Sequence, residues 1–164
     1  MARYAANTSV RVEQSRAEVE GILRRYGAEG FRYGWTDRGG ERIEQIEFAA
    51  SDRVVRFILP MPSKDAAEFA VTPHRRHRRT DKARYEAWEQ ACRQRWRALA
   101  LCIKAKLEAV EVGISEFEEE FLSHIVDPQT GQTMGETIRP QLAQRYAGIG
   151  GQIRLPGLPA PGEV

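Results

Sequence analysis

The stretch TPHRRHRRTDKAR, residues 72–84, is the densest group of side chains that could do chemistry. It sets two histidines, His74 and His77, among six cations: Arg75, Arg76, Arg78, Arg79, Lys82 and Arg84. Clustered Lys and Arg side chains bind phosphates through charge and counterion release. The stretch also leads into a predicted helix, whose N-terminus carries partial positive charge and attracts anions. We therefore predict that it binds nucleic acid, with a merely solvated basic loop as the alternative.

Basic residues continue into the helix that follows. Arg93, Arg97 and Lys104 lie on one charged strip of that helix, and we expect them to extend the same binding surface. Binding of a single strand would also need exposed aromatic rings on which bases can stack. Tyr33 and Trp35 could supply these rings if their sheet face is open, whereas packing beneath the helix would remove them from solvent.

Catalytic and metal-binding patterns are poorly represented in the sequence. It contains no Gly-rich phosphate loop, no G-x-S-x-G and no H-E-x-x-H. Glu116, Glu120 and His124 share one helix face, but a solvated acidic face has the same spacing. His74 and His77 could supply two metal ligands, but the arginines around them would repel a cation. We expect a protein that is not an enzyme and that holds no metal or cofactor.

The charges are segregated although the whole chain carries a net charge of only +2. Residues 74–106 hold eleven Lys and Arg against three acidic residues, a net of +8, and residues 107–127 hold seven acidic residues and no Lys or Arg. Opposite patches of this size can steer association between proteins. A protein partner, contacted by the same charges, is therefore the alternative to nucleic acid.

The first sixty residues predict a small antiparallel sheet preceded by a helix. Alternating Val10 and Val12 indicate a short strand over 8–13, and the Ser15-x-x-Glu18 pattern is a capping box that would start a helix ending near Gly27. Three strands then follow, at 31–35, 42–50 and 53–60, with turns at 37–41 and 51–52. Residues 61–80 are polar and basic, and we expect one long loop.

Residues 81–112 predict a single long helix with two apolar faces. One face carries bulky residues at spacings of three and four: Tyr85, Trp88, Cys92, Trp96, Leu99, Ile103, Leu107 and Val110. The opposite face is mostly small and includes Ala91, Ala98, Leu101 and Ala105. We expect the bulky face to cover the sheet and the small face to allow close approach of another helix, most simply in a homo-oligomer.

The two cysteines belong to this same helix. Cys92 and Cys102 are ten residues apart, which places their Cα atoms about 15 Å apart along a helix. That distance excludes a disulfide between them. We expect both thiols to be buried as small apolar groups.

Two further capping boxes, Ser115-x-x-Glu118 and Thr133-x-x-Glu136, predict two short C-terminal helices, the first ending near Ile125 and the second interrupted at or starting near Pro140. The complete prediction is an α+β fold, in which an antiparallel meander of three or four strands packs on the long helix. Residues 1–147 would form this single domain, and residues 148–164 a Gly/Pro-rich tail. No apolar run approaches the length of a membrane span and the N-terminus lacks a signal pattern, so we expect a cytoplasmic protein.

The sequence resembles a family of small proteins encoded by bacteriophages and prophages, in three blocks that cover most of the chain: ARYAANTSVRVEQSRAEVEGILRRYGA, RQRWRALALCIKAKLEAVEVGISEFEEEFLSHIV and TMGETIRPQLAQRYA. The resemblance implies a phage origin and action in the cytoplasm of an infected bacterium. It supplies no catalytic residues, and HRRHRR lies where the family is expected to vary. We therefore expect a phage protein that binds nucleic acid, in DNA recombination or replication, or alternatively one that inhibits or modulates a host enzyme or defence system.

Overall fold

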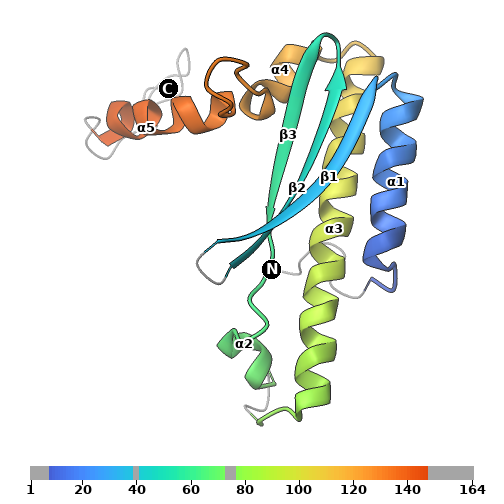
Figure 1. Ribbon diagram of the computed structural model, residues 1–164, viewed down its shortest axis with the longest axis vertical. Coiled ribbons are helices and arrows are strands. Elements are labelled where there is room, and N and C mark those ends of the chain that lie inside the picture. Colours follow the sequence, from blue (N-terminus) through green and yellow to red (C-terminus); the bar gives the residue numbers. More distant parts are fainter. Residues whose placement is uncertain (1–7, 39–40, 73–76, 148–164) are drawn as a thin grey trace, which may run out of the picture.

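A computed structural model describes residues 8–38, 41–72 and 77–147. Nine elements follow one another in these ranges (Figure 1). They are α1 (Val12–Arg25), β1 (Gly30–Arg38), β2 (Glu41–Ala50), β3 (Arg53–Pro60), α2 (Ala67–Ala70), α3 (Asp81–Glu111), α4 (Phe117–Phe121), the 3-10 helix η1 (Leu122–His124) and α5 (Met134–Ala147). This mixed fold of one meander, one long central helix, an N-terminal helix and short C-terminal helices confirms the predicted fold class.

The sheet is a three-stranded antiparallel meander in the order β1-β2-β3. Phe31 pairs with Phe48 across the first two strands, and Phe48 with Val55 across the second and third. Ser51 and Asp52 join β2 to β3 with φ values of 51° and 55°, the left-handed pair that a tight two-residue hairpin requires. Register also brings Arg38 opposite Glu41, while Gly39 and Gly40 of the predicted first turn lie outside the described residues.

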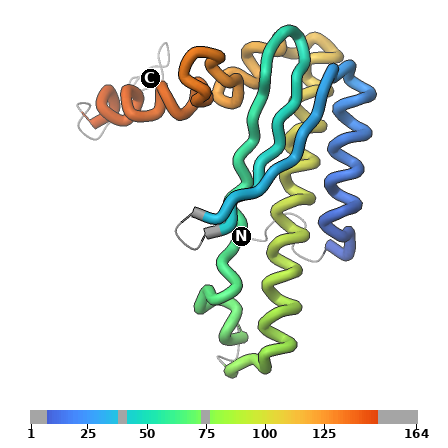
Figure 2. Tube along the Cα trace, viewed as in Figure 1, coloured from blue at the N-terminus to red at the C-terminus, as the bar shows by residue number. Residues whose placement is uncertain are grey.

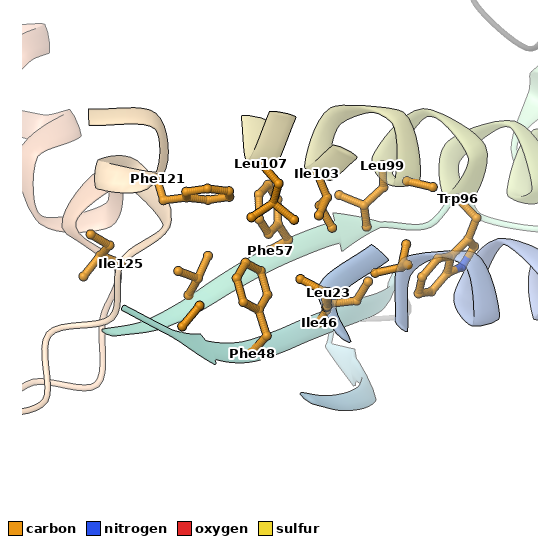
Figure 3. Packing of buried hydrophobic residues seen from close by; sticks show 14 of the residues in the cluster. Leu23, Ile46, Phe48, Phe57, Trp96, Leu99, Ile103, Leu107, Phe121 and Ile125 are labelled. Carbon is orange, nitrogen blue, oxygen red and sulfur yellow. The ribbon is translucent and has the colours of Figure 1, made fainter. Parts of the chain in front are cut away.

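One face of the sheet is covered by α1 and α3 (Figures 1 and 3). Alternate residues of β2 point into this layer, so Ile46, Phe48 and Ala50 are buried together. Trp96 of α3 is fully buried and Leu23 of α1 nearly so. Truncating a buried aromatic residue such as Trp96 to Ala costs about 3–5 kcal/mol. The predicted bulky face of the long helix is therefore the main source of the core.

A capping residue starts α3 and a glycine ends it. The hydroxyl of Thr80 accepts a hydrogen bond from the Ala83 N–H, which caps the first turn. Gly113 follows the last turn with a φ of 71°, and the Ile114 N–H donates to the Ala109 carbonyl at 2.9 Å. This Schellman arrangement stops the helix because only glycine adopts that φ without strain.

The C-terminal part leaves the sheet at its β3 edge. The Val126 N–H donates to the Val54 carbonyl at 2.8 Å, which extends the sheet by a single bridge. The predicted Thr133 and Glu136 capping box is present, since the Glu136 carboxylate accepts from the Thr133 N–H and the Thr133 hydroxyl accepts from the Glu136 N–H. From there α5 extends away from the sheet and α3, and it has no buried residue (Figure 2).

Two predictions about the N-terminal part are wrong. Residues 8–13 form no strand, because α1 starts at Val12 with Arg11 as its N-cap. The Gln14 side chain accepts a hydrogen bond from the Arg11 N–H at 3.1 Å, so the chain caps the helix one turn earlier than expected. Ser15 consequently lies inside the helix and is fully buried.

Three other boundaries also differ from prediction. The expected loop over 61–80 contains α2, and Val71 forms a bridge with Arg78. Glu116 and Glu119, rather than Ser115 and Glu118, form the box that starts α4. This helix ends at Phe121 and η1 follows, which leaves Leu122 exposed.

The predicted small face of α3 is uncovered in the single chain. Ala98, Leu101 and Ala105 are exposed and Ala91 is half-buried. Cys102 belongs to this face and is exposed, whereas Cys92 is buried as expected. Intramolecular packing thus uses only one of the two apolar faces that the helix carries.

Candidate nucleic-acid interface

The described residues of the predicted basic stretch differ in whether they are free to bind a ligand. His74, Arg75 and Arg76 lie outside the described residues. The Arg79 guanidinium donates to the Glu68 and Phe69 carbonyls of α2 at 3.2 and 3.3 Å. These bonds attach α2 to the chain that precedes α3. The Arg79 guanidinium is therefore used within the fold.

The remaining cations of this stretch differ in availability. Arg84 donates to the Asp65 carboxylate at 3.0 Å and is half-buried. Arg78 and Lys82 are exposed and take part in none of the ion pairs found in the described ranges. The Arg78 guanidinium, just before α3, and the Lys82 ammonium, in its first turn, are thus open to an anion.

The predicted strip on α3 lies beside α1 and has partners within the chain. Arg97 forms an ion pair with Glu18 of α1. Arg93 donates to the Gln90 side chain at 2.8 Å and approaches the Glu89 carboxylate at 3.5 Å. Lys104 is exposed. The strip is therefore not a uniform continuation of the basic stretch.

A second group of cationic and aromatic side chains lies where the sequence predicted only core. The Lys64 ammonium lies 4.8 Å from the ring centre of Tyr85 and 5.8 Å from that of Trp88. The two rings are 5.5 Å apart, and Tyr85 is 43% exposed. We call these three residues, together with the exposed Arg78 and Lys82 that precede Tyr85 in the chain, the basic-aromatic surface.

Helix length explains why this surface escaped prediction. The 31 residues of α3 span about 46 Å, whereas strands of eight to ten residues span about 30 Å. The first turns of α3 therefore extend past the sheet, and α2 lies beside them instead (Figure 1). Helical periodicity assigns Tyr85 and Trp88 to the core face but contains no information on where the sheet ends.

A pocket of about 390 Å³ adjoins this surface. It lies between the start of α1, the start of β2, the segment after β3 and the first half of α3. Its lining includes Arg11, Val12, Glu13, Arg42, Glu44, Met61, Pro62, Tyr85, Trp88, Glu89, Cys92 and Arg93. The Arg42 guanidinium lies 4.7 Å from the ring centre of Trp35, which is 57% exposed.

A buried carboxylate forms part of the pocket wall. Glu44 is 4% exposed, and its carboxylate accepts hydrogen bonds from Trp96 Nε1 at 2.6 Å, Arg16 at 3.0 Å and Arg42 at 3.1 Å. The Arg16 guanidinium is also 4.0 Å from the ring centre of Tyr33. These contacts fix Tyr33 against Trp96, so of the two aromatic residues that we considered for stacking only Trp35 is open.

Burial also determines the chemistry of the pocket thiol. Burial, followed by the nearby Glu44 carboxylate, raises the pKa of Cys92 to about 11. The thiol is therefore protonated near neutral pH and is a poor nucleophile. Cys92 contributes an apolar wall to this pocket.

Two members of the group considered for metal binding, Glu120 and His124, contact other side chains instead. The Glu120 carboxylate accepts from Lys106 at 3.1 Å and from the Ser115 hydroxyl at 2.8 Å. The His124 ring stacks on Phe57, with ring centres 4.0 Å apart. Across residues 8–38, 41–72 and 77–147, no three His, Cys, Asp or Glu side chains are grouped in a way that could hold a metal ion.

Comparison with known protein families, curated proteins and solved structures finds no match to this chain. In the part of the chain that the structure describes, none of the helices has both the length and the apolar character needed to cross a membrane.

Proposed function

We propose that this protein is a non-enzymatic nucleic-acid-binding protein that uses the basic-aromatic surface. The observation that carries the proposal is the Lys64 ammonium placed over two neighbouring rings, Tyr85 and Trp88, beside a pocket lined by three arginines. Cations attract the phosphate backbone, and aromatic rings that reach solvent, here the exposed Tyr85 and the half-buried Trp88, provide faces on which bases stack. The same surface therefore offers both groups that a flexible nucleic-acid strand requires.

The free cations at the start of α3 support the same proposal. Arg78 and Lys82 are exposed, and the chain between them and α2 carries Arg75 and Arg76. Of the acidic neighbours, Asp65 is paired with Arg84 and Glu89 with Arg93, whereas Asp81 and Glu86 are exposed. The phage resemblance implies action in the cytoplasm of an infected bacterium, and within that setting we propose a role in DNA recombination or replication.

Fluorescent single- and double-stranded DNA and RNA, titrated at two salt concentrations, test the proposal. We expect binding at low salt that weakens as salt rises, because phosphate contacts release counterions. Absence of binding to all four ligands at low salt would overturn the proposed function. Lys64→Ala combined with Lys82→Ala should weaken binding and flatten its salt dependence. Arg24→Ala with Arg25→Ala removes the same charge from the exposed end of α1 and serves as the matched control.

The predicted basic stretch can be tested separately. Arg75→Ala, Arg76→Ala and Arg78→Ala remove three cations while keeping Arg79, which holds α2 in place. A further reduction in the salt slope is expected from the loss of phosphate contacts. An unchanged slope would assign binding to Lys64 and Lys82 without a contribution from Arg75, Arg76 and Arg78.

A second candidate function is a protein-binding phage factor that inhibits or modulates a host enzyme or defence system. It is favoured by α5, which carries exposed Ile138, Leu142 and Tyr146 at intervals of four on a helix without buried residues. Apolar side chains aligned in this way are suited to a groove on a partner. Recovery of one host protein by the parent chain, and its loss with Leu142→Glu, would favour this candidate.

A further inference from the structure

We infer that the pocket beside the basic-aromatic surface binds one unstacked nucleobase, so that the protein prefers single strands to duplexes. This inference rests on the proposed function and specifies its ligand. Bases paired in a duplex are stacked and cannot enter a side pocket, whereas single strands can turn a base outward. The pocket would therefore convert general phosphate attraction into selection for unpaired nucleic acid.

The dimensions and walls of the pocket suit a planar ring. Its volume of about 390 Å³ is in the range of small-molecule sites. Val12, Met61 and the Trp88 ring supply apolar wall, and Trp88 is oriented by a hydrogen bond from its Nε1 to the Pro62 carbonyl at 2.9 Å. An aromatic wall of fixed orientation provides the stacking face that every base can use.

The polar groups around the pocket favour a base over a bare anion. Arg11 supplies donors and Glu13 a carboxylate acceptor, while Arg93 and Glu89, which form an ion pair at 3.5 Å, add one charge of each sign to the wall. Bases have donors and acceptors on their edges and can satisfy both kinds of group. A backbone phosphodiester has only acceptors, so it could accept from the arginines but would be repelled by the carboxylates of Glu13 and Glu89. The base would thus lie inside and the phosphates outside, toward Lys64, which lies beside Tyr85 and Trp88 of the pocket wall.

Internal bonds hold the pocket in shape without a ligand. Glu44 connects β2 to α1 through Arg16 and to α3 through Trp96. Arg95 of α3 donates to the Pro60 carbonyl, which fixes the end of β3 beside the helix. The walls therefore come from elements that are joined by hydrogen bonds, and little ordering is required when a base enters.

A strand without bases distinguishes binding in the pocket from phosphate binding on the surrounding surface. Affinities of the parent chain are measured for a short labelled DNA strand, for an abasic strand of the same length, and for the matching duplex. We expect the strand with bases to bind about tenfold more tightly than the abasic strand, because stacking of one base contributes a factor of this order. The duplex should bind at the abasic level.

Two variants assign that difference to the pocket. Trp88→Leu removes the stacking wall, and Val12→Trp fills the pocket, so either should make the strand with bases bind like the abasic strand. Arg24→Ala is the control and should keep the parent's preference. Circular dichroism shows whether each variant is folded. If Trp88→Leu does not fold, the affinities of Val12→Trp alone test whether the base binds in the pocket.

The outcomes distinguish this inference from the proposed function. Equal affinity of the parent chain for strands with and without bases would overturn the base pocket and leave nucleic-acid binding intact. A preference that survives in folded Trp88→Leu and Val12→Trp would also overturn it, because stacking would then occur elsewhere. No affinity for any strand at low salt would overturn the proposed function itself.

Discussion

The middle strand contributes a buried carboxylate to each face of the sheet. Glu44 points toward the helices, where Arg16, Arg42 and Trp96 donate to it. Glu47, three residues later, lies on the opposite face between Arg32 and Arg56 of the neighbouring strands. Burial acts to raise the pKa of Glu47, but the hydrogen bonds from the two arginines outweigh burial and lower it. Glu47 is thus stabilised by arginines of the two flanking strands, whereas the partners of Glu44 come from α1, from β2 itself and from α3. Charged and hydrogen-bonding partners are what makes both carboxylates tolerable in the interior.

Ser15 shows the opposite situation, a buried polar group without compensation. Its side chain is fully buried, and in the described structure its hydroxyl has no hydrogen-bond partner. Such a hydroxyl costs about 1–3 kcal/mol. We predict that Ser15→Ala raises the free energy of unfolding by about 1 kcal/mol, as measured by urea denaturation.

Ser115 provides the matched control for that prediction. Its hydroxyl donates to the Glu120 carboxylate at 2.8 Å, so Ser115→Ala removes a hydrogen bond that Ser15 lacks. We expect Ser115→Ala to lower the free energy of unfolding by about 1 kcal/mol. If both substitutions change stability in the same direction, the hydroxyl of Ser15 is satisfied in solution.

His124 gives the protein a pH dependence near neutrality. Burial, with a smaller contribution from Lys106, lowers the pKa of His124 below its ordinary value of 6.5. The unfolded chain then takes up the proton at a higher pH than the folded chain, so protonation favours unfolding. We predict that the free energy of unfolding is highest above about pH 6.5 and falls as pH decreases toward the pKa of the folded state.

An NMR titration of the His124 ring checks this directly, and His124→Gln should reduce the loss of stability between pH 7 and the onset of carboxylate titration. An imidazole that titrates at or above 6.5 in the folded protein would contradict the prediction.

At the scale of elements, periodicity predicted the helices and strands whose packing pattern repeats over many residues, and it missed features that rest on one or two residues. The alternation of β2 and β3 and the three-four spacing of α3 extend over many residues, and all three elements are confirmed. The strand expected over 8–13 rested on only two valines. Two capping patterns overlap there, and the sequence does not show that Ser15 is buried while Gln14 caps the helix.

The pocket could not be predicted for a related reason. Its residues come from four segments, and Val12 and Trp88 of its walls are far apart in the sequence. Their meeting depends on α3 extending past the sheet and on the segment after β3 running on beside the first turns of that helix (Figure 1). The basic stretch was conspicuous because its charges are consecutive, whereas Lys64, Tyr85 and Trp88 become one surface only through folding.

The start of α5 is held against η1 by the close approach of Gly135 to Ser123, in addition to the Met134 N–H bond to the Ile125 carbonyl. A Cβ atom at Gly135 would lie 2.6 Å from the Ser123 carbonyl oxygen, too close for any side chain. We predict that Gly135→Ala displaces the start of α5 and lowers the amide protection of this helix in hydrogen exchange, with little effect on α3.

Gly21→Ala is the control for this substitution. Gly21 lies within α1, and nothing is within 4 Å of the added methyl group. Because alanine favours helix over glycine, the control should stabilise the protein by up to about 1 kcal/mol. Unchanged protection of α5 in Gly135→Ala would mean that the contact with Ser123 does not position the helix.

At the scale of the whole molecule, charge is distributed along the axis of α3. The chain around the start of this helix belongs to the basic segment 74–106, and α4 at the other end belongs to the acidic segment 107–127. Glu108 and Glu111 lie in the last turns, where the helix dipole is already negative and disfavours them. An arrangement that is unfavourable within one chain becomes favourable when an oppositely charged surface approaches each end.

The uncovered small face of α3 offers a way to bring two such ends together. Ala91, Ala98 and Ala105 recur at intervals of seven, with Leu101 beside them. Ala98, Leu101 and Ala105 are exposed. Small residues at this interval let helices approach closely, and an antiparallel pair would place the basic end of one chain near the acidic end of the other. We predict a homo-oligomer held by this face.

Ala98→Glu combined with Ala105→Glu tests the predicted oligomer. Both residues are exposed in the single chain, so the substitutions should leave the fold intact while adding charge to the interface. We expect light scattering to show an oligomer for the parent chain and a monomer for the double variant. Ala17→Glu, at an exposed position of α1, is the control and should keep the parent's mass. A monomeric parent, or a double variant of unchanged mass, would contradict self-association through α3, because buried glutamates without partners cannot be accommodated between closely packed helices.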